Sequence, residues 1–183
     1  MNECTEAENI EVILSEETIK ARVREMAEEI SKDFAGRPVT LICTLKGAVY
    51  FLADLSRALD LPQEIDFIKA SSYGRESVSS GEVKLEVVPR ESLKGKHILW
   101  IEDIIDTGNT ACKIMKYLEE QEPATLTLVS LLNKPSRRVH DSIRIDYLGF
   151  TIPDEFVVGY GLDYAEKFRN LPYVGILRFN KHD

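Results

Sequence analysis

The stretch HILWIEDIIDTGNT, residues 97–110, decides the fold. Its first five residues, His97–Ile101, form an apolar run typical of a buried strand, and apolar residues recur at helical spacing from Thr107 to Leu118. The acidic segment Glu102–Thr110 is therefore predicted to join a strand to a helix. In open α/β sheets, ligands bind beyond the carboxyl ends of the strands, near helix N-termini. We expect a ligand site in this segment.

The junction combines two kinds of chemical group. Its first half places two neighbouring carboxylates, Glu102 and Asp103, at the end of the strand, where they can accept hydrogen bonds from vicinal hydroxyls or ligate a hard cation. Its second half offers hydroxyls, a glycine and backbone amides that suit an anion: Thr107, Gly108, Asn109 and Thr110. A sugar phosphate bound with magnesium would use both halves of the junction. The alternative is a strand that ends in solvated acids and is followed by an ordinary helix start. It explains each residue taken singly but not all of them together.

Strands and helices alternate on both sides of this junction. Ser15 is a plausible N-cap for an amphipathic helix that Gly36-Arg37-Pro38 closes, and an apolar strand at Val39–Leu45 precedes a second helix at Ala48–Leu59. Further strands are expected at the following ranges: Glu64–Ala70, Val83–Val87, Ala124–Leu132, Phe156–Tyr160 and Val174–Leu177. This alternation favours βαβ units and a mostly parallel sheet covered by helices on both faces.

Composition limits the classes of partner. The chain has 183 residues, 44% of them hydrophobic, which favours one domain spanning residues 1–183. Its formal net charge of −8 argues against nucleic acid as a partner, because the general attraction to phosphate is missing. A small ligand is expected instead. An anionic ligand would have to be held by a few local Lys or Arg side chains, backbone amides or a metal.

The sequence favours a soluble, cytoplasmic protein. No apolar run approaches the ~20 residues that cross a bilayer, and the N-terminal residues are acidic and polar, unlike an export signal. The three cysteines, Cys4, Cys43 and Cys112, form an odd set without CxxC spacing. They are interpreted as reduced thiols, and the last two as small buried hydrophobes without chemistry.

A long polar segment, Ser71–Gly81 (SSYGRESVSSG), separates two of the predicted strands. Connections of this length within a compact domain are uncommon and often serve as lids or binding loops. A hairpin tip without function is the alternative, and the residues of the segment alone do not decide between the two.

Four segments together resemble one enzyme family. EDIIDTGNT after a buried strand resembles the signature of type I phosphoribosyltransferases, which use 5-phosphoribosyl 1-diphosphate as ribose donor. Leu45–Gly47 resembles their diphosphate-binding turn, Ser72–Gly74 their mobile catalytic loop, here about residues 71–82, and Phe156–Tyr164 (FVVGYGLDY) their base-binding segment. The similarity is greatest to the hypoxanthine (hypoxanthine-guanine) branch. It implies an α/β fold with a twisted, mostly parallel sheet and a small base-binding hood made from the termini.

The resemblance also implies roles for the residues of the signature. Glu102 and Asp103 would bind the ribose hydroxyls, and together with Asp163 they would ligate Mg²⁺. Residues Thr107–Thr110 would bind the 5-phosphate. Asp106 would be the catalytic base at N7 of the purine.

The other matched segments would bind the purine and the diphosphate. Lys134 would donate to the six-position oxygen of the purine, Phe156 would stack on its ring, and the backbone of Val157 would contact its hydrogen-bonding edge. Ser72 and Tyr73 would belong to the lid. The diphosphate would be held by Lys46, Gly47 and Arg169. Without the resemblance, Lys46 is interpreted as an ordinary surface lysine that follows a strand.

The implied activity is purine salvage, with transfer of a phosphoribosyl group to hypoxanthine or guanine by a homodimer or homotetramer. Two alternatives stay open. A regulator of transcription or RNA could keep this fold as a sensor, but it would need a basic face and could dispense with Lys134. A related transferase could act on xanthine, on guanine alone or on a pyrimidine.

The lid hypothesis leads to a first prediction. Deleting Glu76–Ser79 should lower turnover severely, because water would then reach the reactive ribosyl donor. Folding should change little, as measured by circular dichroism and the thermal midpoint. Near-normal turnover in the shortened chain would refute the role of the segment as a lid.

Overall fold

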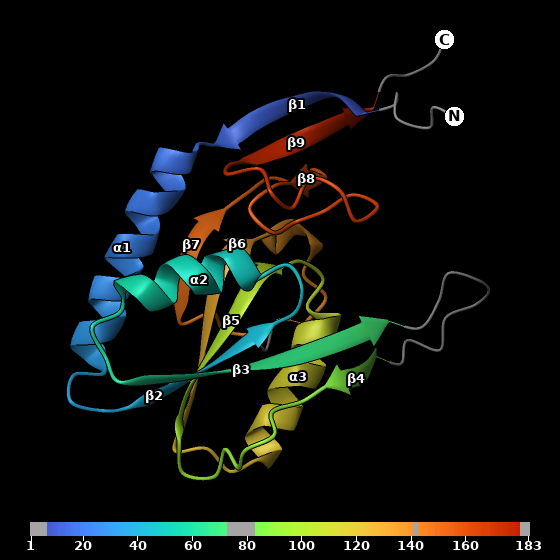
Figure 1. The fold of residues 1–183 in the computed structure, drawn as a ribbon. Helices are drawn as coiled ribbons and strands as arrows, with labels where there is room; N and C mark the ends of the chain where they lie inside the picture. The colour runs from blue at the N-terminus through green and yellow to red at the C-terminus, as the bar shows by residue number, and fades with distance from the viewer. Residues whose placement is uncertain (1–6, 73–82, 141–142, 180–183) are drawn as a thin grey trace.

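The computed structural model describes residues 7–72, 83–140 and 143–179 (Figure 1). Within them the elements follow in the order β1 (Ala7–Leu14), α1 (Glu16–Asp33), β2 (Val39–Thr44), α2 (Val49–Ala58), β3 (Gln63–Ser72), β4 (Val83–Val87), β5 (His97–Ile105), α3 (Asn109–Glu120), β6 (Thr125–Asn133), the 3₁₀ turn η1 (Pro135–Arg137), β7 (Tyr147–Thr151), β8 (Val157–Val158) and β9 (Val174–Phe179). Of the predicted lid, Ser72 ends β3, whereas Tyr73 and the residues up to 82 lie outside the described residues.

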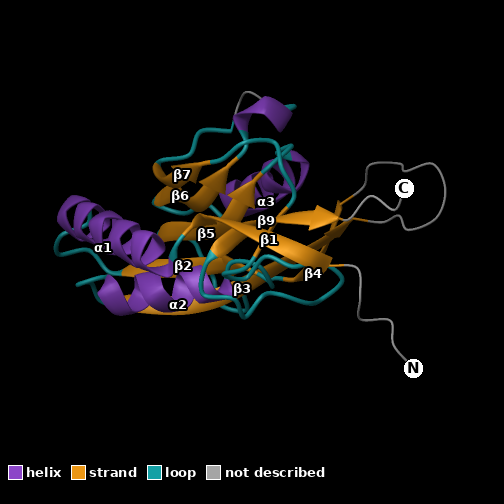
Figure 2. Cartoon of the chain, turned by 90° about the horizontal axis from the view of Figure 1, so that it is seen from above, coloured by secondary structure: helices purple, strands orange, loops and turns teal. Residues whose placement is uncertain are grey.

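The main sheet is mostly parallel, as the alternation of elements predicts. Its six strands lie in the order β4-β3-β2-β5-β6-β7, and only β4 runs antiparallel to its neighbour. Because successive side chains of a strand face opposite sides, Leu41 and Cys43 of β2 join the core under α1 and α2, while Ile42 joins the core under α3. Figure 2 shows α1 and α2 together on one face of the sheet.

Helix α1 begins and packs as predicted. The hydroxyl of Ser15 accepts a hydrogen bond from the backbone N–H of Thr18, and Glu16 and Glu17 lie in the first turn near the positive end of the helix dipole. The side chains at helical spacing are buried: Ile19, Val23, Met26, Ala27 and Ile30. This face covers the sheet and holds the helix in place.

A second, small sheet joins the two ends of the chain, with strand order β1-β9-β8 and antiparallel pairing (Figure 1). It confirms the hood expected from the termini. Two details of the prediction are wrong: the strand expected at Phe156–Tyr160 contains only Val157–Val158, and β1 and β7 were not predicted. Val157 and Val158 position the base-binding segment by pairing with Ile176 and Gly175 of β9.

The decisive strand, β5, is longer than the apolar run predicts. It continues through Ile105, so the two carboxylates lie within the strand and not after it. The pairing with β6, which includes Glu102 with Ser130 and Ile105 with Asn133, extends the strand beyond the apolar run. Helix α3 then begins at Asn109, with Gly108 as its N-cap.

No helix in the described ranges is long and apolar enough to cross a membrane. Cys43 is buried and Cys112 partly buried, each with a free thiol. Burial raises the pKa of the Cys43 thiol to about 12, and the nearby carboxylates of Glu102 and Asp103 add to the effect. The thiol is therefore held protonated and unreactive at neutral pH, as expected of a small buried hydrophobe.

Candidate active site

Two adjoining pockets lie where β5 and β6 end. The smaller has a volume of about 190 Å³ and is lined by Thr44, Glu102, Asp103, Ile104, Ile105, Asp106, Thr107, Gly108, Thr110 and Ala111. The larger, of about 450 Å³, is lined by Asp103, Ile104, Asp106, Lys134, Arg137, Asp154, Glu155, Phe156, Val157, Leu162 and Asp163. Because both are lined by Asp103, Ile104 and Asp106, a ligand could extend from one pocket into the other.

The predicted anion cradle, residues Thr107–Thr110, contributes Thr107, Gly108 and Thr110 to the lining of the smaller pocket. The backbone N–H of Asn109 donates to the Thr107 hydroxyl at 3.4 Å, and α3 starts there with unpaired N–H groups in its first turn. The chain that follows η1 supports this turn, because the N–H of Val139 donates to the Thr107 carbonyl at 2.9 Å. His140 Nε2 also lies 2.7 Å from the Asn109 side-chain oxygen. The segment of Val139 and His140 therefore holds the turn in shape through two contacts.

Glu102 is held by a chain of hydrogen bonds that the sequence did not predict. The Trp100 indole N–H donates to the Thr44 hydroxyl at 3.0 Å, and that hydroxyl donates to Glu102 at 2.6 Å. Trp100 is fully buried, and a buried indole needs an acceptor for its N–H. Burial, reinforced by the neighbouring charge of Asp103, raises the pKa of Glu102 well above its ordinary value.

Asp103 packs on the other side of β5 against the turn after β2. A Cβ atom at Gly47 would lie 1.6 Å from Asp103 Oδ2, and one at Gly161 would lie 1.9 Å from the Gly47 carbonyl oxygen. A side chain at Gly47 would therefore displace the Asp103 carboxylate, and one at Gly161 would clash with backbone atoms and strain a φ of +104°. Burial raises the pKa of Asp103 to about 6, although hydrogen bonds from the backbone N–H groups, including that of Ile104 at 2.8 Å, oppose the shift.

The larger pocket brings together side chains from three segments: Asp106 after β5, Lys134 after β6, and Phe156 beside β8. Lys134 is only 5% exposed, so its ammonium group is held within the pocket and not on the surface. Phe156 is 48% exposed and contacts Tyr164 edge to face, with ring centroids 5.8 Å apart. One face of the ring can therefore receive a flat ligand.

Arg137, which the sequence reasoning missed, lies between two acids of this pocket. Its Nε lies 3.3 Å from Asp106 Oδ1, and its Nη1 lies 3.5 Å from Asp154 Oδ1. Asp106 Oδ1 is buried and makes no hydrogen bond within the described part of the chain. That oxygen can therefore still accept a hydrogen bond from a donor group of a ligand. Arg137 ends the short 3₁₀ turn that Lys134 precedes. Nothing in the sequence indicated its ion-pair partners, Asp106 and Asp154.

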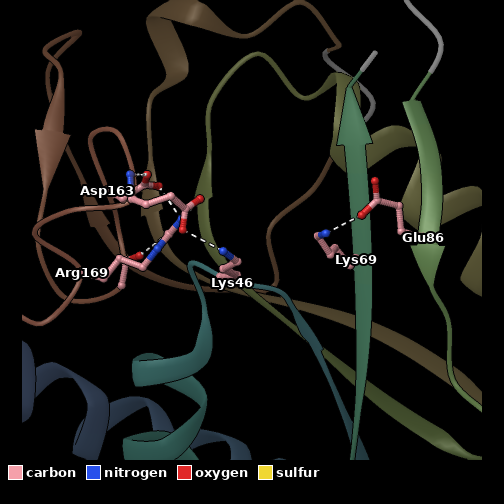
Figure 3. Close-up of polar contacts among 7 residues, drawn as sticks. Lys46, Lys69, Glu86, Asp163 and Arg169 are labelled. Atoms are coloured by element: carbon pink, nitrogen blue, oxygen red, sulfur yellow. Dashed lines mark hydrogen bonds and ion pairs between the residues drawn. The ribbon is translucent and has the colours of Figure 1, made fainter. Parts of the chain in front are cut away.

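The predicted diphosphate side chains belong to one ion network beside the pockets (Figure 3). Arg169 donates to the Gly161 carbonyl at 2.8 Å and contacts Asp163 at 2.8 Å. Lys46 contacts Glu166 at 2.7 Å, and Glu166 lies 3.4 Å from Arg169. Figure 3 also shows Lys69 and Glu86, which join β3 to β4 in a separate pair.

The carboxylates fit a magnesium ion that is shared with a substrate. In the described ranges no three His, Cys, Asp or Glu side chains form a metal cluster of their own. Magnesium is usually held by one or two carboxylates together with water and substrate phosphates, so such a cluster is not required. The raised pKa values of Glu102 and Asp103 reflect charge removed from water, which a cation would stabilise.

Comparison with known proteins agrees with this arrangement. Residues 9–165 match the model of the phosphoribosyl transferase domain family. The chain is 45% identical over 168 residues to the hypoxanthine phosphoribosyltransferase of Salmonella typhimurium, covering 91% of this chain and 94% of that one. The chain belongs to the hypoxanthine phosphoribosyltransferase family.

Solved structures of this family share the fold. The hypoxanthine-guanine phosphoribosyltransferase of Bacillus anthracis superposes with a TM-score of 0.87 at 42% identity, covering 93% of this chain and 100% of that one. A hypoxanthine phosphoribosyltransferase of Staphylococcus aureus gives a TM-score of 0.87 at 43% identity, with 92% and 91% covered. As a member of this family the chain is a pentosyl-transferring enzyme that acts on small molecules.

The buried acids lead to a prediction about stability. Since the folded-state pKa of Asp103, about 6, lies above its ordinary value, the folded state binds this proton more tightly than the unfolded state does. The contribution of Asp103 to stability therefore falls as pH rises from about 4 to 6 and is constant above. In EDTA at pH 7.5, Asp103→Asn should raise the free energy of unfolding by about 1–3 kcal/mol.

Urea denaturation at pH 5 and pH 7.5 measures this effect. The advantage of the variant should shrink at the lower pH, where Asp103 of the parent chain is largely protonated. Asp60→Asn, at an exposed position after α2, is the matched control and should change stability little at either pH. A less stable Asp103→Asn variant at pH 7.5 would contradict the explanation by burial.

Proposed function

We propose that this chain transfers the 5-phosphoribosyl group of 5-phosphoribosyl 1-diphosphate to N9 of hypoxanthine, and of guanine, giving IMP or GMP and diphosphate in purine salvage. The observation that carries the proposal is the larger pocket, in which Asp106, Lys134 and Phe156 converge beside the anion cradle. An acid, a donor-only cation and a half-exposed aromatic face together suit an oxopurine.

The donor would lie across both pockets. Its 5-phosphate would bind the amides and hydroxyls of Thr107–Thr110, and its ribose hydroxyls would donate to Glu102 and Asp103. The diphosphate would bind Lys46, the backbone of Gly47 and Arg169. Mg²⁺ held by Glu102, Asp103 or Asp163 would neutralise the charge of the departing diphosphate.

The acceptor would lie against Phe156, with its six-position oxygen at the Lys134 ammonium group and its edge at the backbone of Val157. As N9 forms a bond to C1 of the ribose, the bond from C1 to the diphosphate oxygen breaks. Asp106 would take the proton from N7 of the purine. Its Oδ1 is buried and makes no hydrogen bond within the described residues, which supports this role, and the ion pair of the same oxygen with Arg137 would keep the carboxylate oriented.

From the family resemblance we also propose one domain across residues 1–183, a cytoplasmic location, a lid that contains Ser72 and Tyr73, and assembly as a homodimer or homotetramer. The exposed apolar side chains of Val49 and Tyr50, in the first turn of α2, are consistent with a contact between subunits.

A purine panel tests the function. With the ribosyl donor and Mg²⁺, hypoxanthine and guanine should release diphosphate, while adenine should be poorer by a factor of ~10⁴ in kcat/KM. The reason is that its amino group cannot accept from Lys134 and leaves a buried donor unpaired. Turnover of xanthine or a pyrimidine alone would support the related transferases. Failure of every base would refute the proposal and favour the sensor alternative.

A second prediction concerns Asp106. Asp106→Asn should lower kcat ~10²-fold or more, because the amide cannot take a proton. The pH–rate profile of the variant should differ from that of the parent chain. The exposed control Asp60→Asn should keep the parent rate and profile. A slow variant with an unchanged pH profile would show that Asp106 only positions the ligand.

A further inference from the structure

One carboxylate bridges the two cations to which we assign the diphosphate. Glu166 Oε2 lies 2.7 Å from Lys46 Nζ, and Glu166 Oε1 lies 3.4 Å from Arg169 Nη2. Each oxygen therefore contacts a different cation, and the two cations come from segments that are distant in sequence. Lys46 follows β2, whereas Arg169 lies in the loop between β8 and β9. Figure 3 shows Lys46 directed toward the Asp163–Arg169 pair.

The contacts of Glu166 are displaceable. Its side chain is 66% exposed and that of Lys46 is 56% exposed, so water can replace either partner. Exposed ion pairs of this kind contribute little to stability. Arg169 is different: it is 22% exposed, and its second contact, with Asp163, and its hydrogen bond to Gly161 would hold it in place without Glu166. Loss of Glu166 would thus leave the arginine positioned.

The backbone directs Glu166 toward the site at some conformational cost. Ala165, Glu166 and Phe168 have positive φ values of 50°, 64° and 73°, which residues with a Cβ seldom adopt. The backbone N–H of Glu166 donates to Asp163 Oδ2 at 2.8 Å, which fixes the turn against the ion network. Such strain is concentrated at binding and catalytic sites.

We propose that Glu166 is an internal competitor of the diphosphate group: its carboxylate occupies Lys46 and Arg169, and the diphosphate of substrate or product must displace it. The proposal rests on the function proposed above for these two cations. Because only the molecules whose cations are released can bind, the apparent affinity for diphosphate is the intrinsic affinity multiplied by the fraction of such molecules. Glu166 thereby weakens the hold on the product diphosphate and favours its release.

The charge state of Glu166 supports this role. The Glu166 carboxyl is mostly exposed and lies between two cations, Lys46 and Arg169, so it carries the negative charge that an exposed carboxylate has at neutral pH. Asp163 and Asp103 also lie near these groups, as a partner of Arg169 and a neighbour of Gly47. The competitor is therefore anionic throughout the neutral pH range.

Replacing Glu166 by glutamine tests the proposal. Glu166→Gln keeps the size of the side chain but removes the charge, so inorganic diphosphate, titrated with Mg²⁺ in a calorimeter, should bind about two- to fivefold more tightly. The KM for the ribosyl donor should fall by a similar factor, because it carries the same group. The KM for hypoxanthine should not change. The difference should shrink at high salt.

Glu122→Gln is the matched control. Glu122 also has a positive φ, 55°, and also pairs with an exposed lysine, Lys94. It differs in position, because it lies where β6 begins, whereas Lys46 lies where β2 ends. This control should bind diphosphate like the parent chain. Tighter diphosphate binding by Glu166→Gln would not be an artefact of misfolding, because damage to the folded structure weakens binding and does not strengthen it.

The outcomes separate the two proposals. Unchanged or weaker diphosphate binding by Glu166→Gln, in a parent chain that turns over hypoxanthine, would overturn the competitor role and leave the function standing. A parent chain that does not turn over any purine would refute the function. Tighter binding by Glu166→Gln and by Glu122→Gln alike would also overturn the competitor role, because a general change of net charge would explain it.

Discussion

The contact between Asp103 and the backbone of Gly47 organises the whole site. This carboxylate comes from β5, the turn that contains Gly47 joins β2 to α2, and Gly161 packs behind that turn from the hood. Three parts of the chain that are distant in sequence therefore meet closely, and a side chain at either glycine would displace a neighbouring group. This packing fixes the positions of the strand that leads to the anion cradle, the turn of Lys46 and Gly47, and the base-binding segment relative to one another.

The same packing has an energetic cost. It takes Glu102 and Asp103 out of water, and burial raises the pKa of both. Most buried charges in proteins are paired, because an unpaired one destabilises the fold. Here Glu102 receives hydrogen-bond donation from Thr44, which Trp100 orients, and Asp103 receives donation from backbone N–H groups. These bonds satisfy the oxygens only partly and leave the pair suited to a cation or to hydroxyl donors.

The sequence predicted the elements that obey local rules. Helix α1 followed from its N-cap Ser15 and its apolar spacing, and the strand–turn–helix around Glu102–Thr110 followed from an apolar run that meets polar residues. The prediction failed where distant partners decide. The polar N-terminal segment becomes β1 because β9 pairs with it, and β5 continues through Glu102 and Asp103 because β6 lies beside it.

The residues of the candidate site also divide into those that the sequence predicts and those that it does not. Residues that belong to a contiguous pattern, such as Asp103 and Thr107, were found from the sequence alone, and the resemblance added Asp106, Lys134 and Phe156, which line one pocket. Arg137 and Glu166 were missed. Their significance lies in partners that only the folded chain brings near, such as Lys46 for Glu166, 120 residues away. No periodicity or spacing contains that information.

These missed residues change how an acidic protein can bind an anionic ligand. With a net charge of −8, the chain must attract phosphate groups through local cations. Yet Lys46 is already paired with Glu166, and Arg169 with Asp163 and Glu166. Binding a diphosphate is then an exchange of one anion for another, in which the cations give up a protein carboxylate rather than bulk water. Exchange keeps the cations oriented before the ligand arrives, and it limits the affinity, so the product of the reaction is not held too tightly to leave.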